Sequence, residues 1–404
     1  MNTPKIRFKG FEDHWEQRKL GEVVGIYDGV HQTPQYQDSG IMFLSVENIT
    51  TLKSEKYISE EAFERDYKVY PQKGDILMTR IGDVGTTNVV QTTGKVAFYV
   101  SLALLKPKEI NSYFLSNAMK TSVFQKGLRE RTLVTAIPQK INKDEIGRVN
   151  VFITNNAEEQ KKIEDYFTAL DHLITLHQRK CDETKQLKKF MLQNMFPKNG
   201  EKNPEIRFEG FTDDWEQRKL RENLSFLKDG THGTHKDVED GPLLLSAKNI
   251  KNGTVQWDES DRRISEDEFK SIHANFKLKE GDVLLTIVGS IGETAILNNS
   301  EGITFQRSVA FLRPASKIIS EFLYSEIQGY KFQKELNERK STSAQPGIYL
   351  SDLGEIPISY PINMDEQVAI GHYFTNIDHL ITLHQRKCEK LKALKKFMLQ
   401  NMFI

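Results

Sequence analysis

The chain has 404 residues, and its 56 Lys and Arg balance its 56 Asp and Glu, so the formal net charge is zero. This length allows two or three domains with sizeable cores. Neutrality excludes a chain that binds nucleic acid through its overall charge and leaves only local basic patches or a charged partner for such a role. The first residues lack the apolar segment of a signal peptide, and no apolar run could cross a bilayer. We therefore expect a soluble, cytoplasmic protein that contacts no membrane.

The segment at the start of the chain returns near its middle. PKIRFKGFEDHWEQRKL at residues 4–20 reappears as PEIRFEGFTDDWEQRKL at 204–220. Two further segments recur in the same order: LSVENI at 44–49 as LSAKNI at 245–250, and GDILMTRIGDVG at 74–85 as GDVLLTIVGSIG at 281–292. The period is far too long for a solenoid, so the chain consists of two homologous halves in tandem.

The globular part of each half has the pattern of a mixed α and β domain. Short apolar runs predict strands, with glycine turns before the second strand of each half: Ile41–Val46, Ile76–Arg80, Leu243–Ala247 and Val283–Val288. Gly82 and Gly85 predict the tight turn of a β-hairpin, and a close approach of the backbone to a phosphate is the alternative. Amphipathic helices are expected over Asn111–Glu130 and Ser320–Arg339, with Phe114, Leu115, Met119 and Val123 facing inward in the first.

Each half ends in a long predicted helix. DHLITLHQRKC occurs without a mismatch at 171–181 and 378–388, followed each time by LKKFMLQNMF. Apolar residues recur at helical spacing, as at Ile163, Phe167, Leu170 and Ile174. Asn156 and Asn363 are suited to cap the helices. About forty residues make a rod of roughly 60 Å, and the other copy is the obvious partner for its apolar stripe. We expect domains at 1–156 and 201–363, with helices at 157–200 and 364–404.

Cysteine and histidine residues give weak signals for chemistry. Cys181 and Cys388 occupy one repeat position, and reduced thiols are the better expectation for a cytosolic chain. His177 and His384 fall on the long helices and are interpreted as surface or interface residues. His232 and His235 could pair on a metal, but no third ligand is near in sequence; a polar recognition loop and a purely structural role are the alternatives.

The sequence contains no motif for catalysis. It lacks a phosphate loop ending in Gly-Lys-Ser/Thr, a G-x-G-x-x-G turn and paired cysteines for zinc. The chemistry that remains lies in loops where the halves differ, with side chains suited to base edges and phosphates. The candidate DNA-binding residues of the first half are Gln32, Thr33, Asn48, Arg80, Thr86, Thr87, Asn88, Arg129, Arg131, Thr132 and Thr135. Those of the second half are Thr231, His232, Thr234, His235, Lys236, Lys248, Asn249, Lys340, Ser341, Thr342, Ser343 and Gln345.

Several segments together resemble the specificity subunit of type I restriction–modification enzymes. They are WEQRKL beginning at Trp15 and again at Trp215, the LSVENI/LSAKNI and GDIL/GDVL strands, QPGIYLSDLGEIPI, and the helix openings EEQKKIEDYFTALDHLI and DEQVAIGHYFTNIDHLI. The resemblance covers essentially the whole chain. The first half departs from it, with IPQKIN where the second has QPGIYL, and AEEQ at Ala157 without a Pro-rich lead.

The resemblance implies an α+β fold with two homologous target-recognition domains in tandem, each followed by a long helix. The two helices would pack as an antiparallel coiled coil with pseudo-two-fold symmetry. Each domain would read one half of a bipartite, asymmetric target in double-stranded DNA. The helices would act as spacer and dock two methyltransferase subunits, which two restriction (helicase–nuclease) subunits then join. This chain would be non-catalytic and without a cofactor; S-adenosylmethionine, ATP and Mg²⁺ would belong to the partners.

Two other classes of function compete with this hypothesis. The neutral charge also suits a cytosolic coiled-coil adaptor with two peptide- or protein-binding domains. A self-contained nuclease or methyltransferase is opposed by the missing N-P-P-[FY] and nuclease carboxylate signatures. The sequence gives neither the DNA target nor the length of its gap, because base preference depends on loop geometry and DNA shape.

Overall fold

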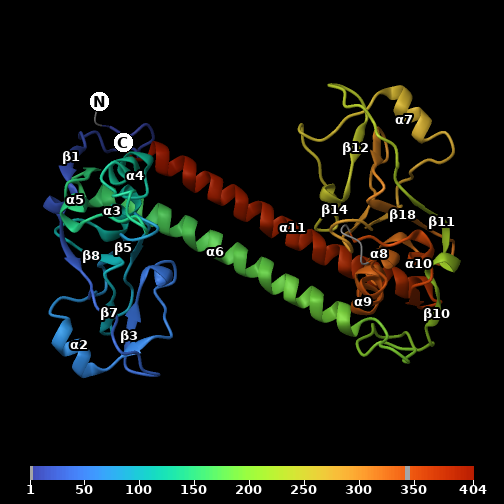
Figure 1. Cartoon of the computed structure of the whole chain (residues 1–404), viewed down its shortest axis with the longest axis horizontal. Helices are drawn as coiled ribbons and strands as arrows, with labels where there is room; N and C mark the ends of the chain where they lie inside the picture. The colour runs from blue at the N-terminus through green and yellow to red at the C-terminus, as the bar shows by residue number, and fades with distance from the viewer. Residues whose placement is uncertain (1–2, 342–345) are drawn as a thin grey trace. The chain divides into compact units, whose positions relative to one another are not determined.

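The computed structural model describes residues 3–341 and 346–404 and divides into two compact units. The first unit contains residues 1–176 and 387–404, and the second contains residues 177–386. Two long helices, α6 (Ala157–Asn194) and α11 (Met364–Asn401), each contribute one part to each unit (Figure 1). The α+β fold with two domains in tandem is confirmed. No helix in the described part of the chain is long and apolar enough to span a membrane.

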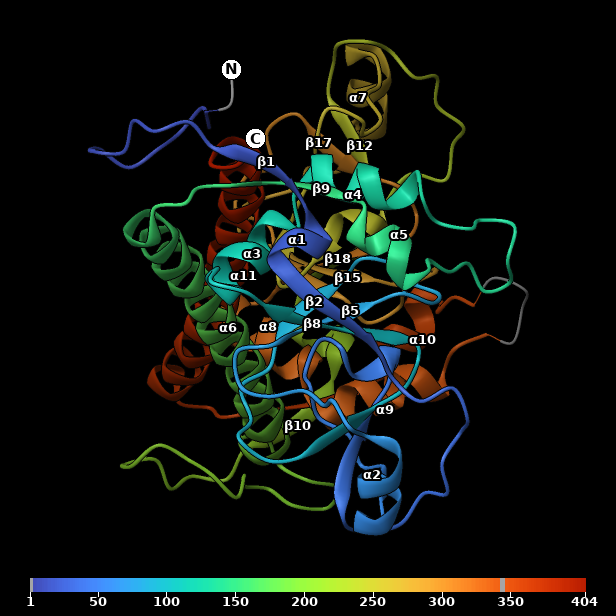
Figure 2. The same cartoon turned by 90° about the vertical axis from the view of Figure 1, so that its left-hand side faces the viewer.

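The first unit contains short strands and helices ahead of α6 (Figure 2). Its strands are β1 (Glu16–Lys19), β2 (Val24–Asp28), β3 (Ile41–Leu44), β4 (Tyr57–Ile58), β5 (Ile76–Thr79), β6 (Thr87–Val89), β7 (Val96–Phe98), β8 (Leu102–Pro107) and β9 (Asn150–Ile153). Its helices are α1 (Leu20–Val23), the 3-10 helix η1 (Val46–Asn48), α2 (Glu60–Asp66), α3 (Ser112–Ala118), α4 (Ser122–Arg129) and α5 (Lys143–Gly147).

A four-stranded sheet in the order β2-β8-β5-β6 separates two hydrophobic cores of the first unit. Successive residues of a strand point to opposite faces, so Ile76 and Met78 pack in one core while Leu77 packs in the other. The first core also holds α3, α4 and the long helices. The second core holds a smaller sheet, β4-β3-β7, and Phe63 of α2. The predicted hairpin is confirmed, because β5 pairs antiparallel with β6 and Gly82 and Gly85 have positive φ.

The second unit repeats this plan with different strand lengths. Its strands are β10 (Glu216–Lys219), β11 (Leu224–Asp229), β12 (Leu243–Leu245), β13 (Ile250–Lys251), β14 (Thr254–Val255), β15 (Val283–Thr286), β16 (Thr294–Ile296), β17 (Ile303–Phe305), β18 (Val309–Pro314) and β19 (Pro357–Tyr360). Its helices are η2 (Leu220–Asn223), η3 (Ala247–Asn249), α7 (Glu266–Ile272), α8 (Ser320–Gln328), α9 (Tyr330–Glu338) and α10 (Leu350–Gly354). The sheet β11-β18-β15-β16 matches β2-β8-β5-β6 strand for strand.

Within each unit, parts of α6 and α11 run antiparallel. In the first unit Phe167 and Asp171 of α6 contact Phe403 and Lys395 of α11, so rising numbers meet falling ones. In the second unit the contacts between Lys188 and Asp378 and between Phe196 and Phe374 follow the same rule. The predicted caps are confirmed. The Asn156 side chain accepts from the backbone amides of Glu158 and Glu159, and that of Asn363 accepts from Asp365.

Each amino-terminal segment is fastened to the start of a long helix by a buried ion pair. The Arg7 guanidinium donates to both carboxylate oxygens of Glu159, which is fully buried. Arg207 makes the same two bonds to Glu366 in the second half. A bidentate arginine–carboxylate pair fixes orientation as well as distance. The recurrence of IRF and of the helix openings in the sequence therefore reflects one contact made twice.

Both helices that the sequence predicted after the main sheet are interrupted, so that prediction was wrong. The run Asn111–Glu130 forms α3 and α4, and Ser320–Arg339 forms α8 and α9. Thr121 caps α4 by accepting a bond from the amide of Phe124, and this new helix start changes the phase of the apolar positions. Val123, predicted to face inward, is therefore 48% exposed, while Phe124 is buried.

Glu326 of α8 is a buried carboxyl whose charge opposes folding. Its Oε1 accepts a bond from the Ser359 amide at 2.8 Å, and burial raises its pKa to about 7. Both states bind the proton at low pH. As pH rises above the usual pKa of a glutamate carboxyl, the unfolded state releases the proton first. The free energy of unfolding therefore falls until about pH 7 and then levels off.

We predict that Glu326→Gln raises the unfolding free energy at pH 8 by on the order of 2–3 kcal/mol and changes it little at pH 4. Denaturant unfolding at the two pH values measures this difference. Glu338→Gln, at an exposed carboxylate on α9, is the control and should show no such dependence on pH. Equal effects of Glu326→Gln at both pH values would contradict the role given to its ionisation.

Candidate nucleic-acid interface

In the first unit the β5–β6 turn is joined to the loop after α4 by hydrogen bonds. The Gly82 amide donates to the Gln139 carbonyl at 2.9 Å, and the Gln139 side-chain amide donates back to the Gly82 carbonyl at 2.9 Å. The Ile141 amide donates to the Arg80 carbonyl at 3.0 Å. These bonds hold residues 80–86 and 130–142 together, and we call this pair of segments the first loop cluster.

Arg80 lies beneath the first loop cluster and not on its surface. The side chain is buried, its guanidinium forms an ion pair with Asp28 at the end of β2, and its Nε donates to the Ile141 carbonyl at 3.2 Å. The sequence predicted a DNA contact for this residue because arginine reads guanine bidentately. In the structure two of its donors engage Asp28 and the Ile141 carbonyl, and these contacts fasten the loop after α4 to the end of β2.

The second unit has an equivalent second loop cluster, formed by residues 287–293 and the described parts of 340–348. The Gly289 amide donates to the Pro346 carbonyl at 3.3 Å, and the Ile348 amide donates to the Ile287 carbonyl at 3.0 Å. The Ser341 amide donates to the Gly347 carbonyl at 2.8 Å. Two segments of unlike sequence are thus clamped to a hairpin turn in the same way in both units.

Most of the predicted residues of the first half hold its loops in shape. The Asn48 side chain accepts a bond from the Ser45 amide at the start of η1, and the Asn88 side chain donates to the carbonyls of Ile49 and Thr50. The remaining contacts join Thr86 to Asp83, Thr87 to Ser116, Arg131 to the Gly127 carbonyl and Thr132 to the Leu128 carbonyl. These side chains form their hydrogen bonds within the protein and so determine the shape of the loop surface that a ligand would contact.

In the second half, too, most predicted side chains that the structure describes form hydrogen bonds or ion pairs within the protein. The Thr231 hydroxyl bonds to His235 Nε2 at 2.8 Å, and His232 bonds to Asp229 at 2.6 Å. The Asn249 side chain accepts a bond from the Ser246 amide at the start of η3. Hydrogen bonds from Asn249 and Lys248 lower the pKa of Asp261 to about 2, and Lys248 forms an ion pair with that carboxylate. Lys340 bonds to Asn337, and the Ser341 hydroxyl accepts from the Gly347 amide. Thr342, Ser343 and Gln345 lie outside the described residues.

Six predicted residues present exposed side chains with no hydrogen-bond partner among the residues that the structure describes. They are Gln32, Thr33, Arg129 and Thr135 in the first unit, and Thr234 and Lys236 in the second. Arg129 directly precedes the first loop cluster, and Thr135 lies in it. Thr234 and Lys236 belong to the loop that follows β11. These side chains have donors and acceptors available for a ligand.

Sequence reasoning missed several exposed residues of the loop clusters. Val134 and Ile137 of the first cluster are 69% and 100% exposed, and Lys140 is exposed beside them. Tyr349, directly after the second cluster, is 71% exposed. The run LVTAIP has neither helical nor strand periodicity, which could have indicated an apolar loop. Exposed apolar side chains of this kind contact thymine methyl groups or partner surfaces.

Contacts between the long helices involve His177, His384 and the two cysteines. In the second unit His177 Nδ1 and His384 Nδ1 are 3.0 Å apart, and buried Cys181 packs on Ile377 and Ile381. Both cysteines are buried. Among the described residues, no group of three or more His, Cys, Asp or Glu side chains is arranged to hold a metal.

The long helices also expose apolar side chains at matched positions. Leu187 and Phe190 on α6 are 47% and 53% exposed, and their repeat equivalents Leu394 and Phe397 on α11 are 41% and 53% exposed. An exposed leucine from the other long helix occurs in each unit, Leu380 in the second and Leu173 in the first. Clustered apolar exposure beside charged residues is typical of a protein-binding surface.

Comparison with known families decides what kind of protein has this arrangement. The family model described as the type I restriction modification DNA specificity domain matches residues 12–186 and again 213–393. The chain belongs to this family. Each match covers one globular part with most of its long helix, so the internal repeat is a repeat of the whole specificity domain.

Relatives and solved structures agree with the family. The type I restriction enzyme MjaVIII specificity subunit of Methanocaldococcus jannaschii is 26% identical over 72% of this chain and 70% of its own length. The putative MjaX specificity subunit of the same organism is 22% identical over 98% of this chain and 95% of its own. The type I restriction–modification S subunit of M. genitalium has the same fold, with a TM-score of 0.69 and 15% identity, covering 100% of this chain and 99% of that one.

Family membership chooses between the hypotheses drawn from the sequence. The relatives are specificity subunits, so this chain belongs with the non-catalytic DNA-recognition subunits of type I restriction–modification systems and not with adaptors, nucleases or methyltransferases. The resemblance of WEQRKL, the strand segments and the helix openings to this family is confirmed. Membership of such a system implies DNA and the other subunits of the system as partners.

Arg80 and Lys140 provide a matched test of fastening against binding. We predict that Arg80→Ala lowers the unfolding free energy of the first unit by about 2–3 kcal/mol, because Asp28 and the Ile141 carbonyl lose a partner. Lys140→Ala should leave stability within about 0.5 kcal/mol and weaken DNA binding about 3–10-fold. Calorimetry and binding titrations measure the two effects. If the Arg80→Ala variant kept full stability but lost discrimination at one base pair, Arg80 would be a DNA-contacting residue and the structural role given to it here would be wrong.

Proposed function

We propose that this specificity subunit reads a bipartite, asymmetric DNA target, with one half-site recognised through each loop cluster and its neighbouring loops. The proposal rests on one observation: two sheets of identical strand order carry loop clusters whose backbone bonds correspond while their side chains differ. A shared frame with different exposed donors is what reading two different sequences requires, because base identity is read by the pattern of donors and acceptors.

The free side chains support different preferences for the two half-sites. The first unit offers Arg129, Thr135, Lys140 and the apolar Ile137, while the second offers Thr234, Lys236 and Tyr349. Arginine and lysine bind guanine or phosphate, and apolar groups contact the thymine methyl. The clamped loops reduce the ordering entropy that binding would otherwise cost, since fewer residues must be fixed at that moment.

We further propose that the matched apolar surfaces of the long helices dock two methyltransferase subunits, which restriction subunits then join. Identical exposed side chains in two places fit two copies of one partner. S-adenosylmethionine would bind to the methyltransferase subunits, and ATP and Mg²⁺ to the restriction subunits. This chain would supply sequence recognition and a scaffold.

Exchange of one domain tests the reading of the two half-sites. We predict that replacing residues 21–155 by the equivalent segment of a related specificity subunit changes one half-site of the methylated target and leaves the other intact. Distant sites couple little, so the second unit should keep its preference. Genome-wide mapping of adenine methylation in cells carrying the complete system reports both half-sites at once.

The reciprocal exchange of residues 221–362 is the matched control and should alter only the other half-site. Loss of both half-sites in a folded, assembled variant would show that the domains do not read DNA independently. Methylation at the original target by both chimaeras would show that recognition lies outside the loop clusters.

Docking is tested at the exposed phenylalanines. We predict that Phe190→Ser and Phe397→Ser each remove one methyltransferase copy from the complex, and that the double variant removes both. Loss of a central aromatic contact commonly costs about 2 kcal/mol or more, a factor of roughly 30 in affinity. Native mass spectrometry of the assembled complex counts the copies. Val123→Ser, an equally exposed apolar position on α4, should leave assembly unchanged. Full assembly by the double variant would contradict the docking surface.

A further inference from the structure

The first unit contains an open cavity of about 360 Å³ between the start of α4 and the last turns of α11, which we call the basic cavity. Four lysines line it, Lys120 on the α4 side and Lys392, Lys395 and Lys396 on α11, together with Ser122 and Gln400. No carboxylate is among its lining residues. In a chain of zero net charge, this is a local concentration of positive charge.

Little of this charge is neutralised. Lys395 is half-buried and forms an ion pair with Asp171 at 2.5 Å. Lys392 and Lys396 are exposed, and neither they nor Lys120 has an ion-pair partner among the described residues. Although the Lys120 side chain as a whole is exposed, its ammonium is surrounded by protein atoms. This burial, with Lys395 nearby, lowers the pKa of Lys120 to about 8. An anion in the cavity would relieve this repulsion.

The lysines are not explained by the stability of α11. Like charges four residues apart, as at Lys392 and Lys396, repel each other on a helix. The helix dipole favours cations only within about the last turn, and the last turn of α11 has no basic residue. Their presence thus costs stability when the cavity is empty, which points to a bound anion as the compensating partner.

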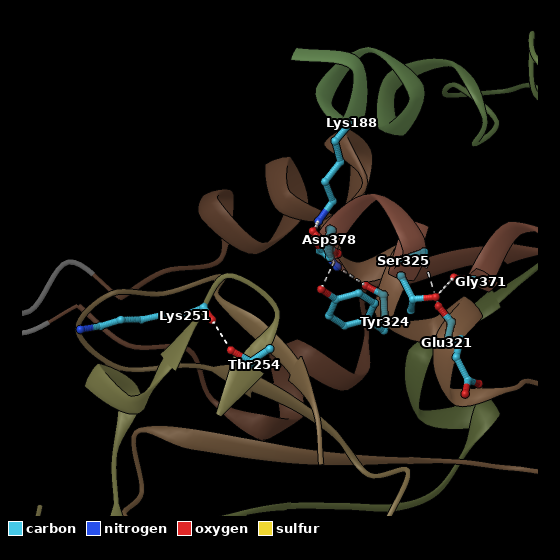
Figure 3. Close-up of polar contacts among 10 residues, drawn as sticks. Lys188, Lys251, Thr254, Glu321, Tyr324, Ser325, Gly371 and Asp378 are labelled. Carbon is cyan, nitrogen blue, oxygen red and sulfur yellow. Dashed lines mark hydrogen bonds and ion pairs between the residues drawn. The ribbon is translucent and has the colours of Figure 1, made fainter. Parts of the chain in front are cut away.

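The second unit provides an internal comparison, because the same helix positions also line a cavity there. Lys185, Lys188 and Lys189 of α6 correspond to Lys392, Lys395 and Lys396, and the cavity of about 450 Å³ also contains Glu293 and Asp378. Lys188 Nζ bonds to Asp378 at 2.5 Å, and Tyr324 donates to the other oxygen of that carboxylate at 2.7 Å (Figure 3). The Lys188–Asp378 pair is the equivalent of the Lys395–Asp171 pair in the first unit, so the second cavity differs by the additional carboxylate of Glu293 and by having three lysines where the basic cavity has four.

The domain, and not the helix, makes the first cavity more basic. The side chain of Gln125 donates to the Gly85 carbonyl, and that of Gln333 donates to the Gly292 carbonyl, so these two glutamines occupy equivalent positions. Lys120 lies five residues before Gln125 and Gln328 lies five residues before Gln333, so Lys120 and Gln328 are equivalent as well. Gln328 accepts a bond from Lys188 at 2.6 Å, whereas a lysine at this position, such as Lys120 in the first unit, would repel the neighbouring lysine. The fold therefore accommodates glutamine at this position, and Lys120 adds charge that packing does not require.

We propose that the basic cavity binds a phosphate of the DNA backbone beside the half-site read by the first loop cluster. Gln125 of α4 bonds to the carbonyls of Met119 and of Gly85, so the wall of the cavity is tied directly to the β5–β6 turn. On this proposal, DNA that contacts this turn would place a phosphate of its backbone at the lysines. Phosphate contacts set the position of a protein on the duplex and carry no sequence information. The inference rests on the proposed reading of DNA by the loop clusters.

The test uses the full chain assembled with its methyltransferase subunits and a duplex containing the methylated target. Affinity is measured over a range of salt concentrations for wild type and for Lys392→Gln/Lys396→Gln. Each lost phosphate contact lowers the slope of log affinity against log salt by about 0.9. We expect a slope smaller by about 1, an affinity about tenfold lower at low salt, and unchanged half-site preference. Lys120→Gln should act in the same direction, and Gln328 in the second unit shows that the fold tolerates it.

Matched variants and a modified duplex locate the effect. Lys185→Gln/Lys189→Gln, at the equivalent but more neutral cavity, should reduce the slope less than Lys392→Gln/Lys396→Gln. Lys180→Gln/Lys387→Gln, at exposed helix positions that line neither cavity, should not change it. Neutral methylphosphonates beside the first half-site should weaken wild-type binding and leave the affinity of Lys392→Gln/Lys396→Gln unchanged.

Three outcomes would overturn the inference: an unchanged salt slope, an altered half-site base preference, or loss of methyltransferase assembly with DNA contacts intact. The last would assign the lysines to an acidic surface of the partner. If the wild-type complex shows no sequence-specific binding at all, the proposed reading function itself fails, and this result is distinct because it does not involve the lysine variants.

Discussion

Each unit of this protein depends on a helix end contributed by the other half of the sequence. In the first unit Phe403, from the second long helix, packs against Trp15, Phe114 and Phe167 at ring distances of 5.5–5.9 Å. In the second unit Phe196, from the first long helix, packs against Phe322, Phe374 and Trp215. Deleting a buried phenylalanine typically costs about 3–5 kcal/mol, a large part of the stability of a domain. Neither half of the sequence therefore completes its core alone.

This exchange accounts for the near identity of the two helices. The end of each helix must fill the same kind of aromatic pocket, and the start of each must meet the same arginine, Arg7 or Arg207. Removing one partner of a buried ion pair leaves an uncompensated charge, so such pairs restrict substitution on both sides. The second half adds a bond from the Trp215 indole to Glu366. Each long helix is thus held by a buried ion pair at its start and by aromatic packing at its end.

The loops are under a different constraint. Their backbone amides and carbonyls bond to one another, as between Gly82 and Gln139 or between Gly289 and Pro346, and side chains such as those of Gln139 and Asn88 add further bonds. Because the backbone bonds occur at equivalent positions in the two units, the exposed side chains of the loops differ while the backbone arrangement is shared. The charge at the base of each domain also varies in this way, since Lys120 and Gln328 occupy one position on the same frame.

The sequence alone determined the duplication, the long helices with their Asn156 and Asn363 caps, the hairpin at Gly82 and Gly85 and the family, because these depend on local patterns and internal repetition. It gave a usable set of loop residues, but it could not separate the exposed Arg129 from the buried Arg80. Only the tertiary structure decided that Arg80 is buried and paired with Asp28, that the predicted helices are interrupted at Thr121 and Gly329, and that Ile137 and Lys140 lie on the surface. The physical reason is that burial and ion pairing depend on residues distant in the chain: Arg80 faces Asp28 and Ile141, and Lys395 faces Asp171.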